Sequence, residues 1–388
     1  MKNKIIRKIL ITGADGFIGK NLKIHLSELK DIEIFTFIRS DNFLDLKKII
    51  SEVDFIFHLA GTNRPENTSD FYLVNKNLTE ALCNHIVLVY KETKRRIPIL
   101  FSSSSQAELN NDYGLSKLAA EEAIQCLLRE YEIPVYIYRL PNVFGKWSKP
   151  NYNSVVSTFC HNIANEEPIF ISDPKIKLTL VYIDDVVRQF IQCIHSAYSP
   201  SKEGFFSILP QYEIALGDLA DQIKSFKSSR NNLMTDTVGH GLSRALYATY
   251  LSYIPPKDFA YSLKENKDIR GTFVEMVKTP NCGQFSYFTA HPEQVRGRHY
   301  HHTKNEKFLV VRGSARFRFR HIMTNQNFEL YTSDEKPEVV QSIPGWVHDI
   351  TNIGVNDMIV MLWANESFDT KLPDTYSSFI PENKKENE

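Results

Sequence analysis

The hydrophobic positions of this chain follow two different patterns. In the first half, short apolar runs such as residues 8–12, 32–38 and 53–57 alternate with amphipathic stretches such as residues 20–29. Strands that alternate with helices in this way are typical of an α/β fold with a parallel sheet. From residue 271 onward, short runs rich in Phe, Val and Tyr alternate with glycine and proline turns, which predicts an all-β sandwich or barrel.

The change of pattern lies near Pro255-Pro256, after a stretch rich in Ser, Asn and Arg. We therefore expect an α/β domain over residues 1–255 and an all-β domain over residues 260–370. A chain of 388 residues fits this division, because single hydrophobic cores rarely grow beyond about 300 residues. The polar, proline-containing end, residues 371–388, is predicted to be a flexible tail.

Composition and charge exclude several classes of protein. Lysine plus arginine number 46 and balance 46 aspartates plus glutamates, so nucleic-acid binding is not expected. No apolar run approaches the roughly 20 residues that cross a bilayer, which argues against a membrane protein. The five cysteines are scattered without a CxxC pair, so no disulfide framework is indicated. We expect a soluble, cytoplasmic protein.

A glycine-rich turn follows the first predicted strand. Gly13, Gly16 and Gly19 lie between that strand and the helix predicted from residue 20. Glycine allows a tight turn and a close approach of the backbone to a pyrophosphate, while the free N–H groups of the helix start attract its charge. The turn therefore predicts a dinucleotide site.

The second strand ends at Arg39-Ser40, where NAD-binding sites usually place an acidic residue for the ribose diol. A guanidinium and a hydroxyl suit a 2′-phosphate, so NADPH is favoured, although Asp41 follows at once. The third strand runs into small residues at Leu59-Ala60-Gly61, as expected beneath a dinucleotide.

Tyr113 and Lys117 are spaced i, i+4 in a predicted helix that follows a Ser-rich strand end, residues 102–105. Both side chains then lie on one helical face, where the ammonium is expected to lower the pKa of the phenol from about 10. Such a phenol can donate and accept a proton near neutral pH. A serine hydroxyl from the strand end can bind the same carbonyl oxygen.

These segments together resemble the extended short-chain dehydrogenase/reductase family, which has a Rossmann-type fold. The resemblance rests on residues 12–19, 58–61, 102–105 and 139–145 and on the YxxxK motif that begins at Tyr113. It implies that Tyr113 donates a proton, that Lys117 holds the nicotinamide ribose, and that Ser104, or Ser103 beside it, binds the substrate carbonyl. The implied cofactor contacts are Gly13, Asp15, Gly16, Phe17, Ile18, Gly19, Arg39, Ser40, Leu59, Ala60, Gly61, Tyr113 and Lys117. The candidate substrate contacts are Arg64, Asn142, Asn153 and Ser154, each of which fits an ordinary polar loop about equally well.

Two further motifs lie in the all-β half. Residues 299–313 carry the pattern HxH-x4-E-x6-G, and residues 344–352 carry PG-x2-H-x3-N. Residues two apart in a strand share a face, so His299 and His301 can converge. The motifs resemble those of the cupin superfamily, whose small double-sheet barrels (the double-stranded β-helix) hold one divalent metal through imidazoles and a carboxylate. The alternative is a basic, His-rich surface loop.

The cupin resemblance implies His301, Glu306 and His348 as metal ligands, with His299 or His302 as a fourth. Zinc suits these nitrogen and oxygen donors, while iron, manganese and nickel stay open. If the barrel is catalytic, a base is needed near the metal, and His302, Lys304 and Tyr300 are the candidates.

The fusion of the two halves resembles the bifunctional epimerase/reductase family of bacterial capsule and O-antigen biosynthesis. This resemblance implies that the cupin epimerises C3 of a UDP-2-acetamido-2,6-dideoxy-4-keto-L-hexose. The reductase half then reduces the C4 ketone with NADPH to UDP-2-acetamido-2,6-dideoxy-β-L-talose, on the route to N-acetyl-L-fucosamine. A homodimer is also implied, as is usual for extended reductases.

Two alternative hypotheses stay open. The cupin is a non-catalytic, metal-stabilised module for binding or dimerisation beside a sugar-nucleotide reductase, or it is a dioxygenase or isomerase fused to a reductase of another pathway. The first predicts no exchange of a substrate proton, and the second predicts an oxygen requirement.

Overall fold

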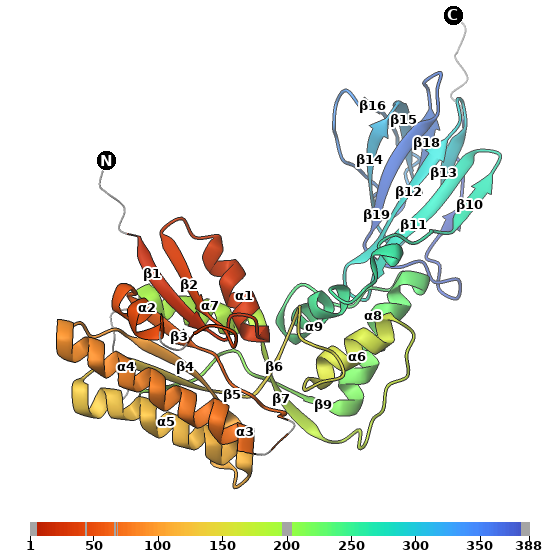
Figure 1. Cartoon of the computed structure of the whole chain (residues 1–388). Helices are drawn as coiled ribbons and strands as arrows, with labels where there is room; N and C mark the ends of the chain where they lie inside the picture. The colour runs from red at the N-terminus through yellow and green to blue at the C-terminus, as the bar shows by residue number, and fades with distance from the viewer. Residues whose placement is uncertain (1–5, 43–44, 66, 68, 196–203, 382–388) are drawn as a thin grey trace, which may run out of the picture. The chain divides into compact units, whose positions relative to one another are not determined.

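The computed structural model describes residues 6–42, 45–65, 67, 69–195 and 204–381 and divides into two compact units (Figure 1). The first unit consists of Met1–Ile223 with Ala245–Ile254, and the second of Lys224–Arg244 with Pro255–Glu388. Residues 224–244 thus group with the second unit, whereas the sequence pattern assigned them to the first domain. A bridge from Met234 to Lys278 accounts for this grouping, because it pairs the segment with a strand of the second unit.

A parallel sheet forms the centre of the first unit. Its strands follow the order β2-β1-β3-β4-β5-β8, and each neighbouring pair is parallel. The strands are β1 (Arg7–Thr12), β2 (Ile32–Phe37), β3 (Phe55–His58), β4 (Ile99–Ser104), β5 (Val135–Leu140) and β8 (Phe205–Phe206). The carboxyl ends of β1, β3 and β4 carry the glycine turn, Leu59–Gly61 and the serines, so these segments meet at one edge of the sheet.

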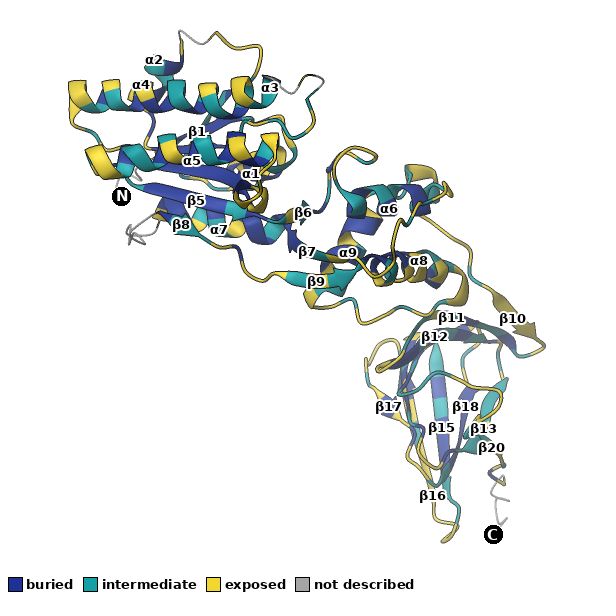
Figure 2. Cartoon of the chain, turned by 90° about the horizontal axis from the view of Figure 1, so that it is seen from below, coloured by how far each residue is buried: buried dark blue, intermediate teal, exposed yellow. Residues whose placement is uncertain are grey.

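Helices cover both faces of this sheet (Figure 2). Apolar side chains of α2, α4 and α5 pack on one face around Ile56 and Ile99, while Phe190 of α7 stacks on Phe57 of the other face. The helices are α1 (Phe17–Ser27), α2 (Leu46–Glu52), α3 (Ser69–Phe71), α4 (Leu78–Thr93), α5 (Asp112–Tyr131) and α7 (Ile183–His195). Strands buried on both faces read as continuous apolar runs, which is the pattern of the first half.

A smaller sheet of the order β6-β7-β9 follows. Its strands are β6 (Asn142–Phe144), β7 (Lys177–Tyr182) and β9 (Tyr212–Ala215). The remaining elements up to residue 258 are the π-helix η2 (Tyr72–Asn77), the 3-10 helices η3 (Ser105–Glu108) and η4 (Pro256–Asp258), and the helices α6 (Val155–Ala164), α8 (Leu216–Asn232) and α9 (Gly241–Leu251).

Two antiparallel sheets form the second unit. One has the order β10-β11-β12-β19-β14-β17 and the other β16-β15-β18-β13-β20. A core that includes Phe308 and Val360 of the first sheet and Phe317 and Ile350 of the second lies between them. The strands are β10 (Glu265–Asp268), β11 (Gly271–Thr279), β12 (Gly283–Ala290), β13 (Val295–Tyr300), β14 (Glu306–Arg312), β15 (Ser314–His321), β16 (Asn327–Ser333), β17 (Val340–Gln341), β18 (Trp346–Asn352), β19 (Met358–Ala364) and β20 (Tyr376–Ser377). The predicted α/β domain followed by an all-β domain is confirmed.

The first part of the predicted flexible tail, residues 371–388, makes defined contacts in the structure. β20 pairs with β13, and the side chain of Ile380 is buried. Such contacts join residues that are far apart in the chain, so the polar composition of the segment gives no sign of them. Residues 382–388 lie outside the described range.

Candidate active sites

The glycine-rich turn is packed too tightly for side chains at two of its positions. Gly13 has a φ of +71°, and a Cβ there would lie 2.6 Å from the main-chain nitrogen of Ala60. A Cβ at Gly19 would lie 2.2 Å from the carbonyl oxygen of Gly13. The N-cap of α1 is Gly16, and no side chain caps the helix. The main-chain N–H groups of this helix start are therefore well suited to hold a phosphate.

The residues at the end of β2 are arranged in an exposed turn. Arg39 and Ser40 are both exposed, whereas the carboxylate of Asp41 accepts a hydrogen bond from the main-chain N–H of Ile38 at 2.7 Å. Asp41 thus stabilises its own turn. The acidic residue that argued against a 2′-phosphate has a structural role of its own.

Tyr113 lies at the start of α5, where Asn111 accepts a capping hydrogen bond from the N–H of Gly114 at 2.8 Å. Burial raises the pKa of the Tyr113 phenol, and a hydrogen bond with the Ser104 hydroxyl opposes this shift only in part. The expectation that Lys117 lowers the pKa is therefore wrong, because burial dominates. The phenol keeps its proton near neutral pH and is a proton donor in this state.

The two candidate serines have different partners. Ser104 is the serine that bonds to Tyr113, and its Oγ also accepts from the N–H of Gln106 at 3.2 Å. Ser103 instead donates to the buried carboxylate of Glu121, which also binds the guanidinium of Arg139 at 2.6 Å. The geometry thus brings Ser104, and not Ser103, together with the phenol.

Lys117 is buried, and its ammonium donates to the main-chain carbonyl of Ser102 at 2.9 Å. Burial lowers the pKa of Lys117 to about 8, against the opposing effect of Glu121. A Cβ at Gly61 would lie 3.3 Å from this ammonium and 3.0 Å from the Oδ1 atom of Asn75. Gly61 therefore keeps open the space beside the ammonium, where a ribose hydroxyl can approach.

Two buried polar residues support this edge of the sheet. Asn75, which the sequence analysis missed, lies in η2 and bonds through its amide to Thr62 at 2.9 and 3.0 Å and to the Ser116 hydroxyl at 3.0 Å. It ties the loop after β3 to the helix of Tyr113. His58 bridges the hydroxyls of Thr12 and Thr79 at 2.7 and 2.8 Å, and burial lowers its pKa to about 3. His58 stays neutral and connects β1 to α4. No pattern along the chain distinguishes Asn75 from other polar helix residues.

The candidate substrate contacts lie in two loops, in β6 and at the start of α6. Arg64 and Asn153 are exposed. The Asn142 amide donates to the carbonyl of Thr179 at 3.1 Å, and the Ser154 hydroxyl caps α6 by accepting from the N–H of Ser157 at 3.3 Å. Asn142 and Ser154 thus have structural partners, which leaves Arg64 and Asn153 as the more accessible pair.

Four side chains of the second unit converge on one point. The ligand atoms of His299, His301, Glu306 and His348 all lie within 4.8 Å of one another. One oxygen of Glu306 lies 3.2 Å from Nε2 of His348, 3.3 Å from Nε2 of His301 and 3.8 Å from Nε2 of His299. These residues come from β13, β14 and β18 and from the loop that joins β13 to β14.

A bulge in β13 brings the imidazoles together. His299 lies directly opposite His348, and the register between the two strands shifts between Gly297 and His299. Gly297 has a φ of +90°, and a Cβ there would lie 2.8 Å from the carbonyl oxygen of His348. The bulge thus requires glycine, and it aims the side chain of His299 at the Glu306 carboxylate.

The four residues fit a divalent metal. Burial alone would raise the pKa of the Glu306 carboxyl, but the surrounding imidazoles hold it well below its usual range. Burial lowers the pKa of His348, so this imidazole is neutral. The buried Nε2 atoms of His299 and His348 have no well-aligned hydrogen-bond partner among the described residues. Neutral imidazoles and an ionised carboxylate are the donors that zinc and related metals bind.

A cavity of about 220 Å³ reaches one member of this cluster, Glu306, and Lys304 lines it as well. The four further polar residues of its lining are Glu275, Gln284, Ser286 and Glu366. Lys304 is only 7% exposed, with its ammonium 5.4 Å from the centre of the Phe368 ring. The ring of His302 instead packs against Tyr300 and Tyr376, with centroids 5.5 and 4.8 Å away. Of the three candidate bases, Lys304 alone lines the cavity.

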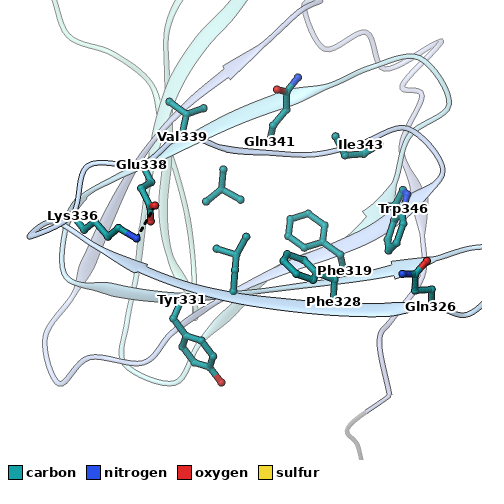
Figure 3. Close-up of a pocket in the computed structure, with 12 residues that line it drawn as sticks. Phe319, Gln326, Phe328, Tyr331, Lys336, Glu338, Val339, Gln341, Ile343 and Trp346 are labelled. Carbon is teal, nitrogen blue, oxygen red and sulfur yellow. Dashed lines mark ion pairs between the residues drawn. The ribbon is translucent and has the colours of Figure 1, made fainter.

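A larger cavity of about 570 Å³ lies between β16 and β17 (Figure 3). The rings of Phe319, Phe328 and Trp346 line it, and Lys336 and Glu338 form an ion pair at 2.8 Å beside it (Figure 3). Its described lining contains neither a candidate metal ligand nor a candidate base. The smaller cavity is therefore the better candidate for proton chemistry.

Comparison with known proteins agrees with this geometry. A model of the NAD dependent epimerase/dehydratase family matches residues 9–208, and a model of the polysaccharide biosynthesis C-terminal domain matches residues 266–376. The chain belongs to the NAD dependent epimerase/dehydratase family. It is 53% identical over 375 residues to UDP-2-acetamido-2,6-beta-L-arabino-hexul-4-ose reductase of Pseudomonas aeruginosa. The aligned region covers 97% of this chain and 99% of the relative. The family indicated by the combined motifs is confirmed.

Solved structures extend the similarity to both units. The capsular polysaccharide assembling protein CapF from Staphylococcus aureus shares 42% sequence identity and a TM-score of 0.87 over 96% of this chain and 100% of that one. A UDP-glucuronic acid 4-epimerase from Bacillus cereus, at 19% identity and a TM-score of 0.53 over 64% of this chain and 98% of that one, shares the fold alone. In the described ranges, every helix is too short or too polar to cross a bilayer.

The pKa of Lys117 predicts an upper pH limit for cofactor binding. Because this pKa is about 8, the ammonium is charged below that pH and loses its charge as the pH rises through it. The affinity for a reduced nicotinamide dinucleotide, measured by fluorescence titration, is expected to fall between about pH 7 and about pH 9. Lys117→Met is expected to bind more weakly and without this decline. An equal decline in Lys117→Met would contradict the assignment.

The crowding at Gly19 predicts a second effect on the cofactor. Gly19→Ala is expected to weaken dinucleotide binding by at least about tenfold, roughly 1.4 kcal/mol, because the new methyl group displaces the Gly13 carbonyl. Gly239→Ala is the matched control, since a Cβ there meets nothing within 4 Å. Equal affinities of the two variants in the same titration would show that the turn does not hold the dinucleotide.

Proposed function

We propose that this protein is a bifunctional enzyme that epimerises C3 and then reduces C4 of a UDP-2-acetamido-2,6-dideoxy-4-keto-L-hexose. The product is UDP-2-acetamido-2,6-dideoxy-β-L-talose, on the route to N-acetyl-L-fucosamine. The substrate is supported by the name of the Pseudomonas aeruginosa relative, a UDP-2-acetamido-2,6-beta-L-arabino-hexul-4-ose reductase. The observation that carries the epimerase activity is the cavity that both Lys304 and Glu306 line.

The reduction takes place in the first unit. The Ser104 hydroxyl interacts with the Tyr113 phenol, and both hydroxyls are proposed to bind the C4 carbonyl oxygen of the sugar. Tyr113 holds a proton near neutral pH and gives it to this oxygen as the carbonyl is reduced. The buried Lys117 ammonium binds the ribose of the cofactor beside Gly61. A bound nicotinamide supplies the hydride for C4.

NADPH is the proposed cofactor. Arg39 and Ser40 lie exposed at the end of β2, and Asp41 is turned toward the N–H of Ile38. A guanidinium and a hydroxyl at this point suit the 2′-phosphate of NADPH.

The epimerisation takes place in the second unit. The C3 proton of a 4-keto sugar is acidic because the resulting negative charge spreads onto the carbonyl oxygen. Lys304 is placed to remove this proton, since it lines the same cavity as Glu306. His301, Glu306, His348 and His299 are proposed to hold one zinc ion, and a bound divalent ion stabilises negative charge on that oxygen. Addition of a solvent proton to the opposite face inverts C3, and the proton removed by Lys304 is released to solvent.

Four polar residues are the proposed substrate contacts of the first unit. Arg64 and Asn153, which are exposed, and Asn142 and Ser154, which also bond to neighbouring main-chain groups, are proposed to contact the diphosphate and the uracil. The enzyme is proposed to act as a homodimer in the cytoplasm.

The two activities can be separated by isotope exchange. Proton NMR of the UDP-4-keto sugar in deuterated buffer is expected to show loss of the C3 proton signal before NADPH is added, and reduction afterward. Tyr113→Phe is expected to keep the exchange and to slow reduction by roughly 100-fold or more, because it lacks the proton donor. Lys304→Met is expected to lose the exchange, because it lacks the base.

Lys307→Met is the matched control for Lys304. This lysine is exposed on β14, with its ammonium over the Trp363 ring, and both activities are expected to persist. Reduction of the 4-keto sugar without deuterium at C3 would refute the epimerase and support a cupin that only binds or dimerises.

A further inference from the structure

The last described segment lies against the strand that carries the metal-ligand candidate His299. β20 pairs with β13, with Tyr376 opposite Tyr300, and these two rings stack with their centroids 5.3 Å apart. Ile380 is buried beyond this pair. The segment is thus anchored after residue 375, which fixes Asp374 close to the loop between β13 and β14.

The carboxylate of Asp374 binds this loop at four points. One oxygen accepts from the N–H of His302 at 3.0 Å. The other accepts from the N–H groups of Thr303 and Lys304, at 2.9 and 2.7 Å, and from the Thr303 hydroxyl at 3.0 Å. Three successive N–H groups that point at one carboxylate fix the main chain of the loop. The main-chain position of Lys304, whose side chain lines the smaller cavity, is set by this contact.

The main-chain carbonyl of Asp374 fixes the neighbouring imidazole. It lies 2.5 Å from Nδ1 of His301. A carbonyl only accepts, so Nδ1 carries the hydrogen and Nε2 keeps a free lone pair. This Nε2 lies 3.3 Å from the Glu306 carboxylate, on the side where the ligand atoms converge.

We propose that Asp374 is a positioning residue that holds both His301 and Lys304 in their working geometry. The proposal rests on the proposed metal centre and base. Asp374 has a φ of +37°, a conformation that aspartate adopts more readily than most residues. In this conformation its carbonyl reaches His301 while its carboxylate reaches residues 302–304, so one residue connects the chain end to both groups.

Zinc affinity tests this inference on the full chain. Asp374→Ala removes four hydrogen bonds, and zinc binding, measured by competition with a chromophoric chelator, is expected to weaken roughly 10- to 100-fold. Asp374→Asn keeps one acceptor atom and is expected to recover most of this affinity. The visible absorption bands of the cobalt(II)-loaded protein are expected to shift in Asp374→Ala and to stay close to wild type in Asp374→Asn.

Asp369→Ala is the matched control, because among the described residues this carboxylate accepts only from the N–H of Lys371, at 2.8 Å, in its own turn. Wild-type zinc affinity and cobalt spectrum in Asp374→Ala would overturn the inference. If Asp374→Ala does not fold, the test is hydrogen exchange of the amides of residues 302–304 in Asp374→Asn. Faster exchange than in wild type supports the inference, and equal rates overturn it. A wild-type chain that binds no zinc would instead refute the metal centre.

Discussion

A buried carboxylate surrounded by three imidazoles is the constraint on which the second unit depends. An ionised Glu306 without a positive partner would cost several kcal/mol in this interior. In the proposed metal centre, the imidazoles and a bound divalent ion would remove that cost, provided that the imidazole nitrogen atoms point inward. Three features orient the nitrogen atoms: the bulge at Gly297, the pairing of His299 with His348, and the hydrogen bond between His301 and the main-chain carbonyl of Asp374. Lys304 is held in the cavity by the same loop.

The first unit also buries ionisable side chains. Its buried Lys117 ammonium donates to a main-chain carbonyl, and its Tyr113 phenol bonds to Ser104. Burial acts oppositely on the charges of these two groups: it moves the pKa of the lysine down and that of the tyrosine up. Near pH 7 this leaves a charged lysine for the cofactor and a protonated tyrosine for the substrate. The two units thus offer different groups: a protonated phenol beside Ser104 in one, and a buried lysine near a candidate metal centre in the other.

The sequence predicts those parts of the structure that rest on local patterns. The glycine turn, the alternation of strands and helices, and the spacing from His299 to Glu306 follow from the local geometry of strands, turns and helices. Effects of distant packing are not visible in the sequence. The pKa of Tyr113 depends on burial, the place of Asn75 depends on a π-helix, and the contacts of Asp374 join residues about 70 positions apart. The pairing of β20 is likewise not visible in the sequence, because main-chain pairing leaves no hydrophobic pattern.

The central claim is that one chain holds two separate reaction centres. Removal of the metal tests this claim most directly. Protein stripped with a chelator, and shown by elemental analysis to be metal-free, is expected to stop exchanging the C3 proton. It should still reduce the already epimerised 4-keto sugar with NADPH, and added zinc should restore exchange. Exchange that persists without metal, or reduction that is lost together with exchange, would contradict the account.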